Sequence, residues 1–343
     1  MKLIFATFFD INYLSRGLIL IKSLQNYHSN FTIYLLCLDS ETKNYFLKNK
    51  VEFSQVVTIE LSELESWFPE LVSCKTNRSK IEYYFTLSPI LPLYILEKYH
   101  HYAVCSLDAD IKFYASPEEI FKDLEKYSII VTPHKFSEIN KDLIKFGKNN
   151  VSFQIFKNDE IGLKCLQKWK KQCIDWCHDY LDEENNRFAD QKYLDTWEND
   201  YPDKVKTLNS STTGIAPWNL NNYSITKKFN SFNSNGEKII FFHFHHFKLI
   251  GENWATNGFE IYKVKTGNEA RSLYFDYWKR LKKINKELAI TTVNIRTNSD
   301  VSKRQKLRTE NSLFLNLFFN SYLSIRFNKL PIILQKIIFK IYA

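Results

Sequence analysis

Residues 102–114, with the sequence YAVCSLDADIKFY, decide the expected fold. An apolar run at 103–107 leads directly into Asp108-Ala109-Asp110, and an apolar pattern resumes after these residues. The run is typical of a buried strand, and ligands collect at the carboxyl ends of strands in open α/β sheets. Two carboxylates at i and i+2 can converge on one Mg²⁺ or Mn²⁺ ion that also holds substrate phosphates. The stretch therefore predicts a site for a metal-bound diphosphate. The alternative interpretation is a solvated Asp-x-Asp turn.

Strand and helix patterns alternate before that stretch. Apolar runs at 2–8, 31–38 and 56–59 indicate strands, and the segments 18–24 and 40–48 between them have helical patterns. Near-continuous apolar strands are typical of parallel sheets, which are buried on both faces. The sequence therefore predicts an α/β fold with a mostly parallel central sheet wound by helices.

The next part of the chain continues this alternation. We expect one helix to end near Leu87 and a new helix to begin at Ser88-Pro89, because proline is favoured in a first helical turn. Further strands are expected at 128–132 and 151–156, followed by a long amphipathic helix over 162–180.

Length and composition narrow the class of protein. The chain has 343 residues, with 44% hydrophobic and 25% charged, which is ordinary for a globular protein with a large core. Only 8 Gly and 8 Pro argue against repeats, low-complexity linkers and a turn-dense all-β fold. The apolar start of the chain soon meets Asp10 and Arg16, so we expect neither a membrane span nor a secretory signal there, and a cytoplasmic protein.

Six cysteines lie at positions 37, 74, 105, 165, 173 and 177. Cys173 and Cys177 are spaced i, i+4 with His178 beside them, which makes a zinc site one interpretation. A second cysteine pair with finger spacing is missing from the sequence. We therefore expect buried thiols in a reducing compartment, not a zinc finger or a disulfide framework.

The net charge of +9 is concentrated at the C-terminal end. Residues 271–343 hold 15 Lys and Arg against 4 Asp and Glu, a net +11, whereas residues 1–270 hold 32 against 34, a net −2. We expect a main domain over 1–270 and a basic helical extension over 271–343. The extension is expected to comprise a helix at 274–288, a polar linker at 291–308 and a basic amphipathic helix at 312–343. Such a helix suits an anionic membrane surface, and packing on the domain or on a partner is the alternative.

Four polar residues outside the Asp-x-Asp stretch are candidates for a site. Arg78 and Lys80 precede a helical pattern, where Arg78 could reach a phosphate or a base, or could be a solvated cation at a helix start. Asp190 and Gln191 could begin a helix and point into a cleft. The alternative for Asp190 is an ordinary acid at a helix N-terminus.

A histidine-rich segment contains the remaining candidates for site residues. The apolar run at 239–242, within the segment 238–248, leads into His243, His245 and His246, with Lys248 close behind. His243 and His245 share one face of a strand, and His246 takes the other. Three histidines at a strand end suit a metal ligand or an acid–base role.

Taken together, these motifs resemble the GT-A glycosyltransferases, most closely the retaining glycogenin and lipopolysaccharide galactosyltransferase-like group. The resemblance runs from Lys2 to about Lys248. Two positions depart from the family pattern: Ser152 replaces the usual Gly, and Phe247-Lys248-Leu249-Ile250 lacks the familiar Gly and Pro-Trp. The matching segments are Phe5-Ala6-Thr7, the Arg78/Lys80 region, Asp108-Ala109-Asp110, Asn150-Val151-Ser152-Phe153, Asp190-Gln191, Ala216-Pro217-Trp218-Asn219, and His243/His245 with Lys248.

The resemblance implies a single Rossmann-like nucleotide-diphospho-sugar transferase domain. It implies that Asp108, Asp110 and one of His243 or His245 hold Mn²⁺ or Mg²⁺, and that Lys248 neutralises the departing diphosphate. Asp190 and Gln191 would be the catalytic residues that line the sugar pocket. Contacts to the nucleotide donor would come from Thr7, Phe8, Asp39, Arg78, Lys80 and Ala109, beside Asp108, Asp110 and Lys248.

The same resemblance implies the partners. The donor would be a nucleotide-diphosphate sugar, with UDP as the expected nucleotide, and the acceptor a saccharide or a lipid-linked saccharide in surface polysaccharide synthesis. The basic extension would place the enzyme on the inner face of an anionic membrane. We expect no nucleic acid partner.

Other classes of protein fit the sequence less well. A sugar-nucleotide nucleotidyltransferase would normally need a Gly- and Lys-rich loop near the N-terminus, and residues 5–17 contain one Gly. A non-catalytic protein that binds membrane or nucleic acid would explain the basic extension but not the acids and histidines at strand ends. A dehydrogenase would need Gly-x-Gly-x-x-Gly after the first strand.

Overall fold

The computed structural model describes residues 2–229, 231–250, 254–265 and 267–288. Its N-terminal part alternates strands and helices as the apolar patterns predict. These elements are β1 (Leu3–Phe9), α1 (Leu14–Tyr27), β2 (Phe31–Cys37), α2 (Ser40–Lys48), β3 (Val56–Glu60), α3 (Leu61–Trp67), α4 (Glu70–Asn77) and α5 (Lys80–Tyr99).

Helix α5 is one continuous helix, so the predicted new start at Ser88-Pro89 is wrong. The Ser79 and Glu82 side chains form a reciprocal capping box at its N-terminus, and both Pro89 and Pro92 lie inside the helix. Each proline removes a backbone N–H, but both are buried in the core, where packing overrides the local preference.

The central sheet has seven strands in the order β3-β2-β1-β4-β7-β6-β8. Strands β3, β2, β1 and β4 are parallel neighbours, whereas β7 runs antiparallel between β4 and β6. The predicted α/β class with a mostly parallel sheet is therefore confirmed. The remaining strands of the sheet are β4 (Ala103–Leu107), β6 (Ile129–Pro133), β7 (Asn149–Lys157) and β8 (Val205–Thr207).

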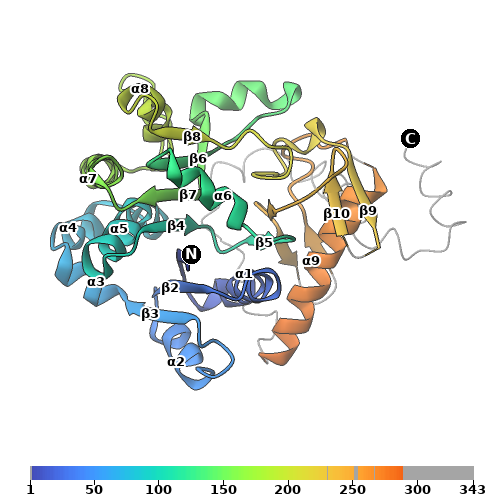
Figure 1. Cartoon of the computed structure of the whole chain (residues 1–343), viewed down its shortest axis with the longest axis horizontal. Helices are drawn as coiled ribbons and strands as arrows, with labels where there is room; N and C mark the ends of the chain where they lie inside the picture. Colours follow the sequence, from blue (N-terminus) through green and yellow to red (C-terminus); the bar gives the residue numbers. More distant parts are fainter. Residues whose placement is uncertain (1, 230, 251–253, 266, 289–343) are drawn as a thin grey trace, which may run out of the picture.

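Helices cover both faces of the sheet (Figure 1). Alternate side chains of a strand point to opposite faces, so Phe5 lies in one buried cluster and Ala6 in the other. The first cluster includes residues of α1 and α9 (Asn268–Glu287), and the second includes residues of α4, α5 and α7 (Glu160–Asp175). The helix predicted over 162–180 thus ends at Asp175. All six cysteines are buried and free.

Shorter elements complete the fold, and two of them join the segments that carry the candidate site. Strand β5 (Ile111–Phe113) pairs antiparallel with β12 (Phe241–His243), which joins the Asp-x-Asp segment to the histidine segment. The other short elements are α6 (Glu118–Lys122), α8 (Trp197–Asp200), β9 (Ile225–Lys228), β10 (Ser231–Ser234), β11 (Glu237–Lys238), β13 (Lys248–Ile250) and β14 (Trp254–Thr256).

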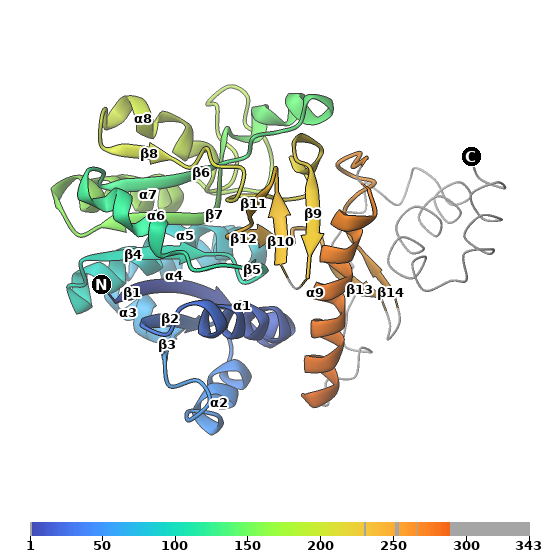
Figure 2. The same cartoon turned by 45° about the vertical axis from the view of Figure 1, so that its right-hand side comes forward.

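Helix α9 packs beside α1 and the β9–β10 hairpin (Figures 1 and 2). Its Asp276 pairs with Lys112 of β5 at 2.7 Å, and the Lys112 side chain is 7% exposed. The expected division at 270/271 falls inside this helix. The linker and the amphipathic helix expected beyond residue 288 lie outside the described residues. Within the described ranges, the helices are too short or too polar to cross a membrane.

Candidate functional site

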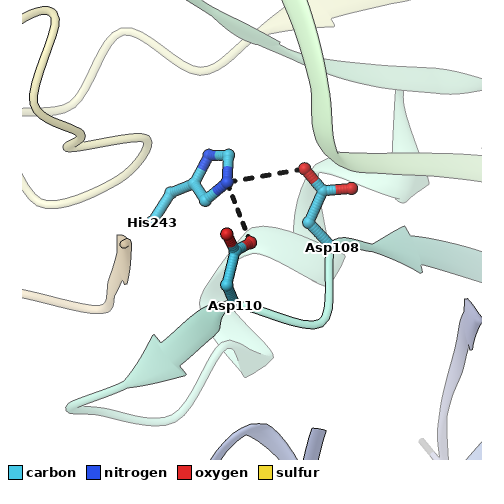
Figure 3. A group of neighbouring side chains, drawn as sticks. All are labelled: Asp108, Asp110 and His243. Atoms are coloured by element: carbon cyan, nitrogen blue, oxygen red, sulfur yellow. Dashed lines mark ion pairs between the residues drawn. The ribbon is translucent and has the colours of Figure 1, made fainter. Parts of the chain in front are cut away.

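Three potential metal ligands meet beside the end of β4 (Figure 3). The apolar strand ends at Leu107, and Asp108 then donates its backbone N–H to Ser152 of β7 at 3.0 Å. The chain turns through Asp108 and Asp110 into β5, whose pairing with β12 sets His243 opposite Ile111. One ligand atom from each of Asp108, Asp110 and His243 lies within 4.8 Å of the other two.

The His243 imidazole is directed at both carboxylates. Its Nε2 lies 3.0 Å from Asp110 Oδ1 and 3.5 Å from Asp108 Oδ2. Although His243 is buried, neither ring nitrogen has a well-aligned hydrogen-bond partner among the described residues. Carboxylate oxygens are the ligands that Mg²⁺ and Mn²⁺ prefer, and neutral imidazole is a common metal ligand. The three residues therefore fit a divalent cation.

The electrostatics of this group favour a positive charge between the two acids. Burial raises the pKa of Asp108 to about 6, with His243 opposing the rise and Asp110 adding to it. Burial also works against ionised Asp110, but His243, and then His245 and Arg16, hold its pKa below the usual range. His243 is buried too, yet the carboxylates raise its pKa. Its imidazolium form can thus supply the positive charge that a divalent cation would supply.

The structure brings His243, not His245, into the ligand group. The His245 ring centroid lies 5.4 Å from that of His243 and 5.2 Å from that of Trp218. Trp218 belongs to the turn singled out at 216–219, and its ring also packs edge-on against His134 and His243. Burial lowers the pKa of His245 well below its usual value, so this ring is a neutral neighbour.

Asp190 and Gln191 lie in a turn that precedes a short 3-10 helix starting at Lys192. Asp190 is 2% exposed, and its Oδ2 has no hydrogen-bond partner among the described residues. Burial raises the pKa of Asp190 to about 7; a hydrogen bond from Ser88 opposes the rise, and the nearby charge of Asp108 adds to it. Gln191 donates to the carbonyl of Phe146 at 2.9 Å.

The residues expected to contact the nucleoside have well-defined places at strand ends. Thr7 of β1 donates its hydroxyl to the carbonyl of Leu107 at 2.8 Å, which ties β1 to the end of β4. Phe8 is partly buried. Asp39 accepts from the backbone of Ile11 and Thr42, both at 2.8 Å, and so caps α2. Contact of these residues with a nucleoside stays a prediction.

The three cations predicted to bind the donor differ in their surroundings. Arg78 donates to the carbonyls of Cys173 and Ile174, so it fastens the start of α5 to the end of α7 and is not a solvated cation. Lys80 is exposed, with its Nζ 3.3 Å from a carboxylate oxygen of Asp10. Lys248 is exposed at the start of β13, and Ala109 is buried between the two acids.

Arg16 is a neighbour of the site that the sequence did not reveal. It lies in the first turn of α1, and its Nη2 donates to the carbonyl of Phe247 at 3.0 Å. Its guanidinium stacks over the Tyr13 ring at 4.5 Å. One feature of the sequence could have pointed to Arg16: it lies just after β1, and ligands collect at the loops that follow the carboxyl ends of parallel strands.

Comparison with known proteins gives relatives of unassigned function. No family model matches the chain. The chain is 27% identical over 281 residues to the uncharacterized protein YfnD of Bacillus subtilis (strain 168), covering 81% of this chain and 88% of YfnD. It is 28% identical over 250 residues to the uncharacterized protein YfnF of the same strain, covering 70% and 80%.

The solved structures that are similar to this chain include glycosyltransferases. Mouse xyloside xylosyltransferase 1 has a TM-score of 0.47 at 10% identity, over 71% of this chain and 97% of that chain. The glycosyltransferase GlyE of Streptococcus pneumoniae TIGR4 has 0.48 at 13%, over 85% and 64%. The galactosyltransferase LgtC has 0.42 at 14%, over 61% and 74%. Because these likenesses are weak, the case for an activity depends on the residues of the site.

Proposed function

We propose that this protein is a metal-dependent glycosyltransferase. The donor is a nucleotide-diphosphate sugar, with UDP as the expected nucleotide, and the acceptor is a saccharide or lipid-linked saccharide in surface polysaccharide synthesis. The observation that carries the proposal is the convergence of Asp108, Asp110 and His243 beside the end of a parallel strand. A divalent cation held there, in the crevice where α/β sheets bind ligands, suits a diphosphate group.

The residues of the site have distinct tasks in the transfer. Asp108, Asp110 and His243 would hold Mn²⁺ or Mg²⁺, which stabilises the negative charge of the departing nucleoside diphosphate as a Lewis acid. Asp190 and Gln191 would line the pocket of the transferred sugar. Beside burial, the charge of Asp108 raises the pKa of Asp190, so the two carboxyls influence each other electrostatically. This supports a sugar pocket beside the ligand group.

The bond changes balance without a further reactant. The bond from the anomeric carbon to the diphosphate oxygen breaks, and its electron pair stays on that oxygen. A hydroxyl oxygen of the acceptor bonds to the anomeric carbon, and its proton passes to the departing diphosphate. We propose that the anomeric configuration is retained, in which case no side chain has to act as a general base on the acceptor hydroxyl, because the departing diphosphate takes its proton.

The basic C-terminal region supports a proposed location of the enzyme at a membrane surface. Residues 271–343 carry a net +11, against −2 for the rest of the chain. Cationic segments are attracted to anionic membrane surfaces by about 1 kcal/mol per Lys or Arg. We propose that this region brings a cytoplasmic enzyme to the inner face of a membrane that displays its acceptor. If a chain lacking residues 291–343 binds anionic liposomes as well as the whole chain, this part of the proposal is wrong.

Thermal unfolding with a panel of nucleoside diphosphates, each with and without Mn²⁺, tests the central proposal. A ligand that binds only the native state adds about 2.7 kcal/mol at 100 times its Kd. We expect one diphosphate to raise the unfolding midpoint in a Mn²⁺-dependent way, and Asp110→Asn to remove that increase. Asp142→Asn, at an exposed position, is the matched control. The absence of a Mn²⁺-dependent shift with every diphosphate would contradict the proposal.

A further inference from the structure

A chain of backbone hydrogen bonds links the metal-ligand group to Arg16. Phe244 donates its N–H to the carbonyl of Asp110 at 3.0 Å, and Phe247 donates to the carbonyl of Phe244 at 3.0 Å. Arg16 then donates from Nη2 to the carbonyl of Phe247 at 3.0 Å. The turn at 244–247 therefore lies between Asp110 and the first turn of α1. Lys248 directly follows this turn.

Most of the hydrogen-bonding capacity of Arg16 is unused. A guanidinium has five N–H donors, and among the described residues Arg16 uses one of them, in the bond to Phe247. No carboxylate in the described ranges lies within 4.0 Å of the guanidinium nitrogens. The Tyr13 ring lies against the face of the group, a contact that uses none of its N–H donors. Arg16 is also partly buried, where an unpaired charge is costly.

Other cations close to the site are already engaged. Arg78 donates to Thr86 and to two backbone carbonyls. The buried ammonium of Lys112 pairs with Asp276, and Lys80 lies beside Asp10. Arg16 lowers the pKa of nearby Asp110, but among the described residues it has no ion-pair partner within 4.0 Å, unlike Lys112 and Lys80. It also uses fewer of its N–H donors than Arg78 does. An anion that is present only during function would supply that ion-pair partner.

We propose that Arg16 binds the diphosphate group of the nucleotide donor through its free N–H donors. A planar guanidinium matches phosphate oxygens bidentately, whereas an ammonium acts as a point charge. Since Arg16 also holds the backbone that leads to Lys248, the two cations would approach the diphosphate from linked segments. This inference rests on the proposed function. It adds a third source of positive charge, after the metal ion and Lys248, for the departing group.

The test measures diphosphate and nucleoside binding to the Mn²⁺-saturated protein by calorimetry. Arg16→Gln is expected to weaken diphosphate binding roughly tenfold to a hundredfold, the usual range for hydrogen bonds to charged groups. Arg16→Lys should recover part of that loss, and binding of the nucleoside without phosphates should stay unchanged. Arg280→Gln, an exposed arginine of α9, is the matched control and should bind like the wild type.

A second measurement separates phosphate binding from a purely structural role. Mn²⁺ affinity without nucleotide, followed by electron paramagnetic resonance, should be the same in Arg16→Gln and the wild type. In a transfer assay, kcat should fall more than KM rises, because the leaving group carries the most charge in the transition state.

Each outcome decides between the ideas. Equal loss of nucleoside, diphosphate and Mn²⁺ binding in Arg16→Gln would show that Arg16 only supports the turn at 244–247, and would overturn the inference. Unchanged diphosphate binding in both Arg16 variants would overturn it too, while leaving the proposed function intact. A wild type without Mn²⁺-dependent diphosphate binding would overturn the inference and the proposed function together.

Discussion

Replacing Asp190 with asparagine is expected to stabilise the protein at neutral and alkaline pH. The Asp190 carboxyl is 2% exposed, and burial is the main reason that its pKa rises to about 7 from an ordinary value of 3.8. One pKa unit corresponds to about 1.4 kcal/mol, so ionising Asp190 in the folded state costs about 4 kcal/mol. Asparagine has nearly the same shape and carries no charge, so it removes this cost.

Because the pKa of Asp190 is raised in the folded state, the stability gained by Asp190→Asn depends on pH in a characteristic way. Well below pH 3.8, the ordinary pKa of the group, the carboxyl is protonated in both the folded and the unfolded state, and it contributes no penalty. Between pH 4 and pH 7 the unfolded chain releases the proton first, so the stability of the wild type falls as pH rises. Above pH 7 the penalty is complete. The advantage of Asp190→Asn should therefore be small at pH 4 and reach its maximum by pH 8.

Urea unfolding of the wild type and Asp190→Asn at pH 4, 6 and 8 measures this difference directly. Asp142→Asn, at an exposed position, controls for the general effect of removing one carboxylate. If Asp190 lines the sugar pocket, Asp190→Asn should also keep Mn²⁺-dependent diphosphate binding and lose most of its turnover. An Asp190→Asn variant that is no more stable than the wild type at pH 8, or a gain that does not vary with pH, would refute the reasoning.

Three further predictions concern the metal site and α9. Mn²⁺ affinity should fall between pH 8 and pH 5.5, because protons compete at His243, whose pKa is raised, and at Asp108, whose pKa is about 6; a flat profile in a resonance titration would contradict this. His243→Ala should lower Mn²⁺ affinity at least tenfold more than His245→Ala in the same titration, since only the former lies in the ligand group. Asp276→Ala should lower the free energy of unfolding by about 3 kcal/mol, because it leaves the buried Lys112 ammonium without its partner, and Lys112→Met in that background should restore part of the loss in urea unfolding.

The sequence predicts this fold well where a buried element appears as a run of apolar residues that are adjacent in the chain. The strand at 103–107 is buried along its whole length and ends in two acids, so both the strand and the candidate ligands can be recognised from adjacent residues. The direction in which a strand runs cannot be recognised in the same way. A strand buried on both faces has the same apolar pattern whether it runs parallel or antiparallel, so the reversed β7 was not visible in its residues.

Other features depend on contacts between distant residues. The choice between His243 and His245 follows from the pairing of β12 with β5, about 130 residues earlier in the chain. Arg16 was missed because its neighbour in the site is the carbonyl of Phe247, 231 residues away. The helix break predicted at Pro89 failed for a related reason: burial by distant elements outweighs the local cost of proline.

The packing of α9 against α1 has a consequence for protein synthesis. One buried cluster contains both Leu3 of the first strand and Ile284 of the last described helix. Translation proceeds at roughly 5–20 residues per second, so the apolar face of α1 waits on the order of 10 to 50 seconds for α9 to be made. During that time the nascent chain exposes the apolar face of α1, and exposed apolar surface promotes aggregation. We therefore expect the yield of folded protein in cells to depend on chaperones that bind nascent chains, more strongly than the stability of the finished fold would indicate.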